Sequence, residues 1–193
     1  ISGADPRDAA CAVRPRLELG LDSLDERSLA RAIERPRLGI LRRYFFSSAD
    51  AETAALSEAA LARLAAAGAT LVDVSLPAGF DQVHAMHRRL MACEAAEYHR
   101  RTFAAPRAGY GPNIAALIDE GFAVSMTQYQ EALQHQIAFR HAVQRAIGDL
   151  DALVTPSTPG PAPASLATTG DARFNSPWSH AGVPTASFPV ALT

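Results

Sequence analysis

Hydrophobic and polar positions between residues 36 and 77 follow the order of a strand, a helix and a second strand. An apolar centre at Leu38–Leu41 predicts the first strand, and "ATLVDVSLP" predicts a second, buried strand that ends at Pro77. Between them, residues 50–68 predict an amphipathic helix that stops at Gly68. Its apolar positions among the alanines are Leu56, Leu61 and Leu64. Such a unit favours parallel strands joined by a right-handed crossover.

Residues 80–148 are expected to be largely helical. The pattern predicts a long helix over 80–103, a short helix closed by Gly121, and a third helix that begins at Ser125 and runs to Gly148. One face of the long helix is expected to carry Val83, Met86, Leu90, Glu94 and Tyr98. The inner stripe of the third helix is expected to consist of Tyr129, Leu133, Ile137, Arg140 and Ile147.

Residues 151–193 combine short apolar runs with proline-rich coil. "DALVTPS" predicts a short buried strand, residues 156–164 predict coil, and "TASFPV" predicts a last strand. The stretch "GDARFNSPWSHAGVPTASFP", at residues 170–189, is expected to form neither a helix nor a strand. Residues 1–35 predict a polar connector, in which "DSLDERSLARAIER" forms a short helix or an irregular segment. The chain is therefore expected to be a single α/β domain, or part of one, over residues 1–193.

Composition narrows the classes of protein that fit this pattern. The 193 residues are 48% hydrophobic and 20% charged, which suffices for a sizeable core. The net charge of −2 gives no general electrostatic reason to bind nucleic acid or an anionic membrane. No apolar run reaches the roughly 18 residues that a membrane span needs. Since no signal peptide is visible and Cys11 and Cys93 lie in no CxxC motif, we expect reduced thiols and a cytoplasmic location. The first residue is not Met, so we expect a processed chain or a piece of a longer one.

Candidate catalytic groups are few. His84 and His87 are three residues apart on a predicted helix, but no third ligand follows at a metal-site spacing, so we expect no metal and no cofactor. Glu94 and Glu97 are consistent with acid–base work or, more simply, with structural hydrogen bonds. The sequence contains no GxSxG, Walker or GxGxxG motif, and all 18 basic residues are arginine, which excludes any lysine-based mechanism within this chain.

The region from residue 151 to residue 189 offers a different kind of candidate, a binding wall. Thr155 and Pro156 are predicted at the carboxyl edge of a strand, where ligands gather in open α/β sheets. Further along, the chain offers flat aromatic walls and directional hydrogen-bonding groups, namely Phe174, Trp178, Asn175 and His180. Gly182 allows close backbone approach, and Pro184 fixes the turn that follows. From spacing alone, a pocket wall and a packed loop that covers the sheet remain equal alternatives.

Several of these segments resemble the C-terminal part of the amidase signature family. "DALVTPSTPGPAP" is similar to that family's strand-to-loop segment, and "TGDARFNSPWSHAGVPTASFPV" to its later Phe-Asn, Gly-x-Pro and Ser-x-Pro signature. "RLGILRRYFFSSADAETAALSEAALARLAAAGATLVDVSLP" resembles the family's βαβ segment, and "ISGADPRD" the segment before it. The resemblance implies a mixed central sheet flanked by helices. It also implies hydrolysis of a carbon–nitrogen amide bond by a Ser nucleophile, a second Ser and a Lys base.

The sequence departs from the family where the catalytic residues are expected. It has no Gly/Ser-rich run and no Lys, and it ends before the family's closing strands. The resemblance therefore implies a C-terminal portion that shapes a substrate pocket but carries no catalytic residue. The pocket residues that it implies are Thr155, Pro156, Phe174, Asn175, Trp178 and His180.

Three interpretations remain open from the sequence. The chain is part of an amidase that acts on a small amide, a non-catalytic binding or scaffold protein that retains half of an amidase fold, or an unrelated α/β domain. In the first two, we expect a homodimer or a complementary N-terminal segment as partner, because half a sheet leaves an unpaired strand edge. Alone, the chain is expected to be inactive.

Overall fold

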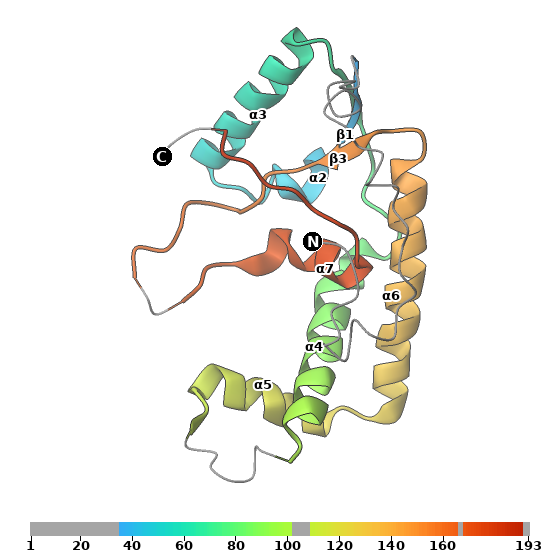
Figure 1. Ribbon diagram of the computed structural model, residues 1–193, viewed down its shortest axis with the longest axis vertical. Coiled ribbons are helices and arrows are strands. Elements are labelled where there is room, and N and C mark those ends of the chain that lie inside the picture. The colour runs from blue at the N-terminus through green and yellow to red at the C-terminus, as the bar shows by residue number, and fades with distance from the viewer. Residues whose placement is uncertain (1–34, 102–108, 166–167, 191–193) are drawn as a thin grey trace, which may run out of the picture. The chain divides into compact units, whose positions relative to one another are not determined.

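The computed structural model describes residues 35–101, 109–165 and 168–190, and its strands form a three-stranded parallel sheet (Figure 1). The strands are β1 (Arg37–Ile40), β2 (Thr70–Asp73) and β3 (Ala152–Val154), in the order β2-β1-β3. In this register, Gly39 lies opposite both Val72 and Leu153. The α/β class, the βαβ unit and the strand in "DALVTPS" are thus confirmed. The expected connector over residues 1–35 lies almost wholly outside the described residues.

The sheet separates two apolar clusters because successive side chains of β1 point to opposite faces. Leu38 and Ile40 pack with Leu61 of helix α3 (Ala51–Ala66) on one face, while Leu41 belongs to an aromatic core on the other. Between them, Gly39 is required sterically, since a Cβ there would lie within 2.8 Å of side-chain atoms of neighbouring residues. Those neighbours are Leu150, Leu153 and Val74.

The aromatic core is the larger of the two clusters and joins segments that are far apart in the sequence. Its buried members are Leu41, Phe45, Phe80, Val83, Phe139, Val143, Phe174, Trp178 and Ala181. They come from residues 41–45 directly after β1, from residue 80, from two long helices, and from residues 174–181. The core therefore holds the C-terminal segment against the sheet and the helices.

The helices α4 (Val83–His99), α5 (Pro112–Ala123) and α6 (Met126–Ile147) form the predicted helical region. Ser125 begins α6 with a capping box, in which its hydroxyl accepts from the backbone N–H of Gln128. The long helix predicted over 80–103 instead starts with the 3-10 turn η2 (Phe80–Gln82) and ends at His99. Gly121 does not close α5, which continues to Ala123, because Gly121 is the point where α5 meets α4 at Ala92.

The predicted inner stripe of α6 is correct only in part, because Ile147 packs against the aromatic core but Ile137 and Arg140 are exposed. Ile137 is 56% exposed, whereas the buried side chains of this helix are Ala132, Phe139, Ala142 and Val143. Alanines face the neighbouring helices because small side chains let helices approach closely. The prediction considered only large apolar residues and therefore assigned the buried face of α6 to the neighbouring side of the helix. On α4, Val83 and Leu90 are buried as predicted, but Tyr98 is 83% exposed.

Two expectations for the C-terminal region are also wrong. Residues 170–189 contain the 3-10 turn η4 (Ala172–Phe174) and helix α7 (Ser176–Ala181), which ends at Gly182 in the left-handed conformation with φ 63°. "TASFPV" forms no strand, since residues 183–190 have neither helical nor strand structure. A strand needs a hydrogen-bonded neighbour, and no strand of the described part of the chain pairs with this segment.

Candidate functional site

The strand order creates a switch point at the carboxyl edge of the sheet. From β1 the chain proceeds to β2 on one side, and β3 lies on the other side, so the loops that follow β1 and β3 diverge there. These loops are tied together, because the N–H of Asp50 donates to the carbonyl of Pro159 at 2.7 Å. On the other side, Arg42 Nε donates to Asp73 at the end of β2 at 2.8 Å. Ligands bind at such a crevice in open α/β sheets, so the chemical groups at this edge are the first candidates for a site.

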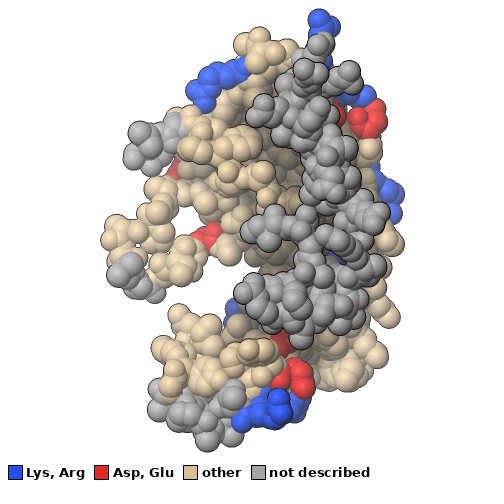
Figure 2. All heavy atoms as spheres, viewed as in Figure 1, with Lys and Arg blue, Asp and Glu red and all other residues tan. Residues whose placement is uncertain are grey.

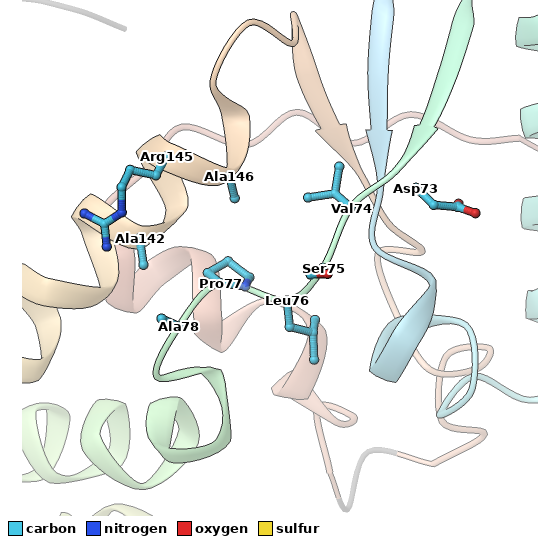
Figure 3. Close-up of a pocket in the computed structure, with 9 residues that line it drawn as sticks. All are labelled: Asp73, Val74, Ser75, Leu76, Pro77, Ala78, Ala142, Arg145 and Ala146. Carbon is cyan, nitrogen blue, oxygen red and sulfur yellow. The ribbon is translucent and has the colours of Figure 1, made fainter.

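Two pockets lie at this edge. The β2 pocket, of about 450 Å³, is lined by Asp73, Val74, Ser75, Leu76, Pro77, Ala78, Ala142, Arg145 and Ala146 (Figure 3). Figure 3 shows the side chains of Asp73 and Arg145 at opposite ends of it, and the Asp73 carboxylate already binds Arg42. The β2 pocket therefore brings few chemical groups together.

The second pocket, which we call the Tyr44 pocket, measures about 370 Å³ and contains more chemistry. It is lined by Arg43, Tyr44, Ser47, Ser48, Leu76, Phe80, Asp81 and His84. Two of these lining residues, Leu76 and Phe80, are apolar, and the others carry a charge or a hydrogen-bonding group. An apolar wall with a few convergent polar groups is typical of a small-molecule site, and we take this pocket as the candidate functional site.

Tyr44 and His84 form the centre of the Tyr44 pocket. Tyr44 lies in the turn α2 (Arg42–Phe45) after β1, and its Oη is 2.8 Å from Nε2 of His84 in the first turn of α4. Burial raises the pKa of the Tyr44 hydroxyl, although Arg173 acts in the opposite direction. Burial, followed by the charge of Arg173, lowers the pKa of His84. At neutral pH the pair therefore consists of a phenol and a neutral imidazole.

Phe174 and Trp178, predicted as pocket walls, lie in the aromatic core beneath the Tyr44 pocket. Phe174 is 1% exposed and its ring centroid is 5.1 Å from that of Phe45, while Trp178 stacks on Phe45 at 5.5 Å. Phe174 also meets the Tyr44 ring at 5.9 Å. Both side chains thus support the turn that carries Tyr44, and contact with a substrate stays a prediction for each.

The other predicted residues near the switch point are Thr155, Pro156 and Asn175. Thr155 is half-buried and Pro156 buried directly after β3, at the carboxyl edge as expected. Asn175 is exposed, and its Nδ2 donates to the carbonyl of Ser157 at 3.3 Å. That bond ties the start of α7 to the loop after β3 and so keeps both beside the switch point.

His180 lies apart from these residues, in a cluster of histidines between α4, α6 and α7. It is fully buried, and its Nε2 is 2.9 Å from Nδ1 of His135, whose own Nε2 is 3.0 Å from the carbonyl of Gly79. Because a carbonyl only accepts, His135 carries its proton on Nε2, and His180 donates from Nε2 to the bare Nδ1 of His135. His180 Nδ1 is then a bare acceptor, and it is buried without a partner among the described residues.

This environment favours the neutral form of His180. Burial first, and then the neighbouring His135 and His87, lowers its pKa to about 4. The ring of His87 meets that of His180 edge to face at 5.9 Å.

Sequence reasoning missed the His135–His180 pair because 45 residues separate the two histidines. It missed Tyr44 because "RRYFF" resembled the end of a strand.

Several charged side chains on the described surface form ion pairs. Arg88 and Glu120, on neighbouring helices, approach to 2.7 Å. In the view of Figure 2, arginines lie next to acidic side chains in several places.

No group of three His, Cys, Asp or Glu side chains in the described ranges could hold a metal ion. No helix in those ranges is long and apolar enough to cross a membrane. Cys93 is half-buried, with a free thiol.

Comparison with known proteins points to one family. The family model described as Amidase matches residues 1–193. An amidase of Pseudomonas putida is 28% identical over 212 residues, which cover 100% of this chain and 43% of that protein. One of the subunits of the glutamyl-tRNA(Gln) amidotransferase from Koribacter versatilis (strain Ellin345) is 28% identical, covering 84% of this chain and 37% of the relative.

Solved structures of amidases have a fold similar to that of this chain. A crystal structure of an amidase matches with a TM-score of 0.71 and 25% identity, covering 80% of this chain and 39% of that one. A peptide amidase in complex with the competitive inhibitor chymostatin matches with a TM-score of 0.59 and 22% identity, covering 98% and 44%. The chain therefore spans less than half the length of each of these four proteins.

Proposed function

Because the chain belongs to the amidase family, we propose that it forms part of the substrate-binding region of an enzyme that hydrolyses a carbon–nitrogen amide bond. The observation that carries this proposal is the family match, which runs over all 193 residues. The placement of the Tyr44 pocket at the switch point of the sheet supports the same conclusion.

Amide hydrolysis by acyl transfer needs a nucleophile, a base and a donor to the oxyanion. We propose that a serine from another part of the enzyme attacks the amide carbon, the amine leaves with a proton, and water then releases the acid. The sequence contains no lysine, so a lysine base must come from another part of the enzyme. The role left for this chain is to bind and orient the amide.

We also propose that a second segment or protein chain supplies the catalytic groups that this chain lacks. The chain covers 43% of the Pseudomonas putida amidase, and another relative is named as one subunit of an amidotransferase. Both observations support a partner that carries the catalytic groups. We place the assembled enzyme in the cytoplasm, which cell fractionation followed by immunoblotting would test.

Two measurements on the purified 193-residue chain test the proposal. Ammonia release from benzamide and from hexanamide should not exceed that of buffer, because the chain lacks the lysine base. Two-dimensional ¹H–¹⁵N NMR should nevertheless show that benzamide shifts amide signals around the Tyr44 pocket. Turnover that a serine-directed acyl trap abolishes would contradict the inactive role, and the absence of benzamide binding would contradict the binding role.

A further inference from the structure

The backbone of Tyr44 adopts a conformation that costs free energy. Its φ is 76° and its ψ is −63°, and it is the only non-glycine residue with a positive φ in the part of the chain that the structure describes. This is the rare γ-turn geometry, which strains a bulky residue. Such strain persists only where the surroundings determine the conformation, and it is concentrated at functional sites.

Local hydrogen bonds and ring contacts hold the strained turn in place. The N–H of Tyr44 donates to Ser47 Oγ at 3.1 Å, and its carbonyl accepts from the N–H of Ser48 at 2.8 Å. The Tyr44 ring meets the edge of Phe80 at 4.8 Å and of Phe45 at 5.3 Å. The effect of these contacts is to carry the hydroxyl away from its own turn and to the imidazole of His84.

The hydrogen bond to His84 leaves Tyr44 Oη able to serve a ligand. If His84 Nε2 accepts a hydrogen bond from the phenolic O–H, the lone pairs of Oη remain free to accept an N–H. If Nε2 carries the imidazole proton, the phenolic O–H remains free to donate to a carbonyl. An amide group presents both an N–H donor and a carbonyl acceptor. The pair therefore matches an amide in either tautomer.

The charged groups around the pair come from several elements. Arg43 and Asp81 line the pocket from the turn after β1 and from η2, and both are exposed. Arg173 and Asp171, at the start of η4, form an ion pair with each other and act electrostatically on both Tyr44 and His84. Because these charges are of both signs, they do not impose a charged ligand on the site.

We propose that Tyr44 Oη, positioned by His84, contacts the amide group of the substrate and favours small amides that carry an apolar or aryl substituent. This inference rests on the proposed function, because it assumes that the Tyr44 pocket binds an amide. The apolar side chains of Leu76 and Phe80 would pack against the substituent. Tyr44 is then a specificity-determining residue and His84 a positioning residue.

The test compares benzamide affinities of variants of the 193-residue chain by NMR titration. Tyr44→Phe should weaken benzamide binding by roughly three- to tenfold, as expected for the loss of one neutral hydrogen bond. It should leave the affinity for toluene, which lacks the amide, unchanged. The matched control Tyr129→Phe removes a hydroxyl from α6, outside the pocket, and should change neither affinity.

The positioning role has a separate readout. His84→Ala should weaken benzamide binding about as much as Tyr44→Phe, whereas His84→Gln, which retains a hydrogen-bonding group near Nε2, should restore part of the affinity. Equal benzamide affinity in wild type and Tyr44→Phe would overturn the inference while leaving the proposed function intact. A wild-type chain that binds no benzamide would overturn both. A parallel loss of benzamide and toluene binding in Tyr44→Phe would reduce Tyr44 to a structural role.

Discussion

Acid should destabilise the fold through His180. The imidazole is fully buried, and protonation of its bare Nδ1 would place a charge and a donor where the described residues offer no acceptor. Its pKa in the fold is about 4, against an ordinary value of 6.5. As the pH falls below 6.5, His180 is protonated in the unfolded chain but stays neutral in the folded chain. The free energy of unfolding therefore decreases until the pH reaches about 4.

The size of the effect follows from the linkage relation. A pKa difference of this size corresponds to roughly 3 kcal/mol in full, at about 1.4 kcal/mol per pKa unit. Between pH 7.5 and pH 5, the expected loss from His180 alone is about 2 kcal/mol. The pKa of His87 is also lowered by burial, so this neighbour adds a loss of the same sign. His135 and Arg140 face α7 from α6, and Arg140 Nε donates to the carbonyl of Ala181 at 2.7 Å.

Urea unfolding followed by circular dichroism at pH 7.5, 6 and 5 would measure this loss. His180→Gln retains a donor near Nε2 but cannot be protonated in this range, so its free energy of unfolding should fall less steeply with pH than that of wild type. The comparison uses the slope and not the absolute stability, which the smaller side chain will also change. His141→Gln, at an exposed position of α6, controls for the replacement itself. Equal slopes for wild type and His180→Gln would refute the reasoning.

Two further predictions concern packing. A Cβ at Gly121 would lie 2.0 Å from the carbonyl oxygen of Ala92, so Gly121→Ala should force α5 away from α4 and lower the free energy of unfolding by about 1–3 kcal/mol. Gly111→Ala, where the added Cβ would meet nothing in the described part of the chain within 4 Å beyond its chain neighbours, should change stability little in the same urea titration. Trp178→Ala should destabilise the chain by roughly 3–5 kcal/mol in that titration, because it empties the space stacked on Phe45, and a loss below 1 kcal/mol would contradict its place in the core.

Local signals in the sequence were sufficient for most elements of the fold. The strand at Leu38–Leu41, the helix that ends before Gly68 and the cap at Ser125 depend on side chains within a few positions of each other. α7 was missed because Pro177 and Gly182 suggested coil. In the structure Pro177 occupies the first turn, where proline is tolerated, and Gly182 ends the helix. A proline and a glycine six positions apart or fewer therefore do not distinguish a loop from a six-residue helix.

The candidate site was less accessible to sequence reasoning because its contacts are long-range. Forty residues separate Tyr44 from His84, and no periodicity relates them. The positive φ of Tyr44 has no sequence signal, since glycine or asparagine would be expected in that conformation. The carboxyl edge after β3 was predicted correctly, because a strand followed by proline-rich coil is a local pattern. Which side chains meet there depends on the order of the strands.

The aromatic core connects the predicted residues to the Tyr44 pocket, and this connection decides how the role of Trp178 can be tested. Trp178 stacks on Phe45, Phe45 meets Phe174, and both Phe45 and Phe174 meet the ring of Tyr44. Removing the indole should therefore loosen the support of the strained turn even if Trp178 never touches a ligand. A Trp178→Ala chain that remains folded and binds toluene normally but benzamide weakly would show that this support reaches the Tyr44 hydroxyl. Unchanged binding of both probes would assign Trp178 to the core alone, since the hydroxyl would then keep its position without the indole beneath it.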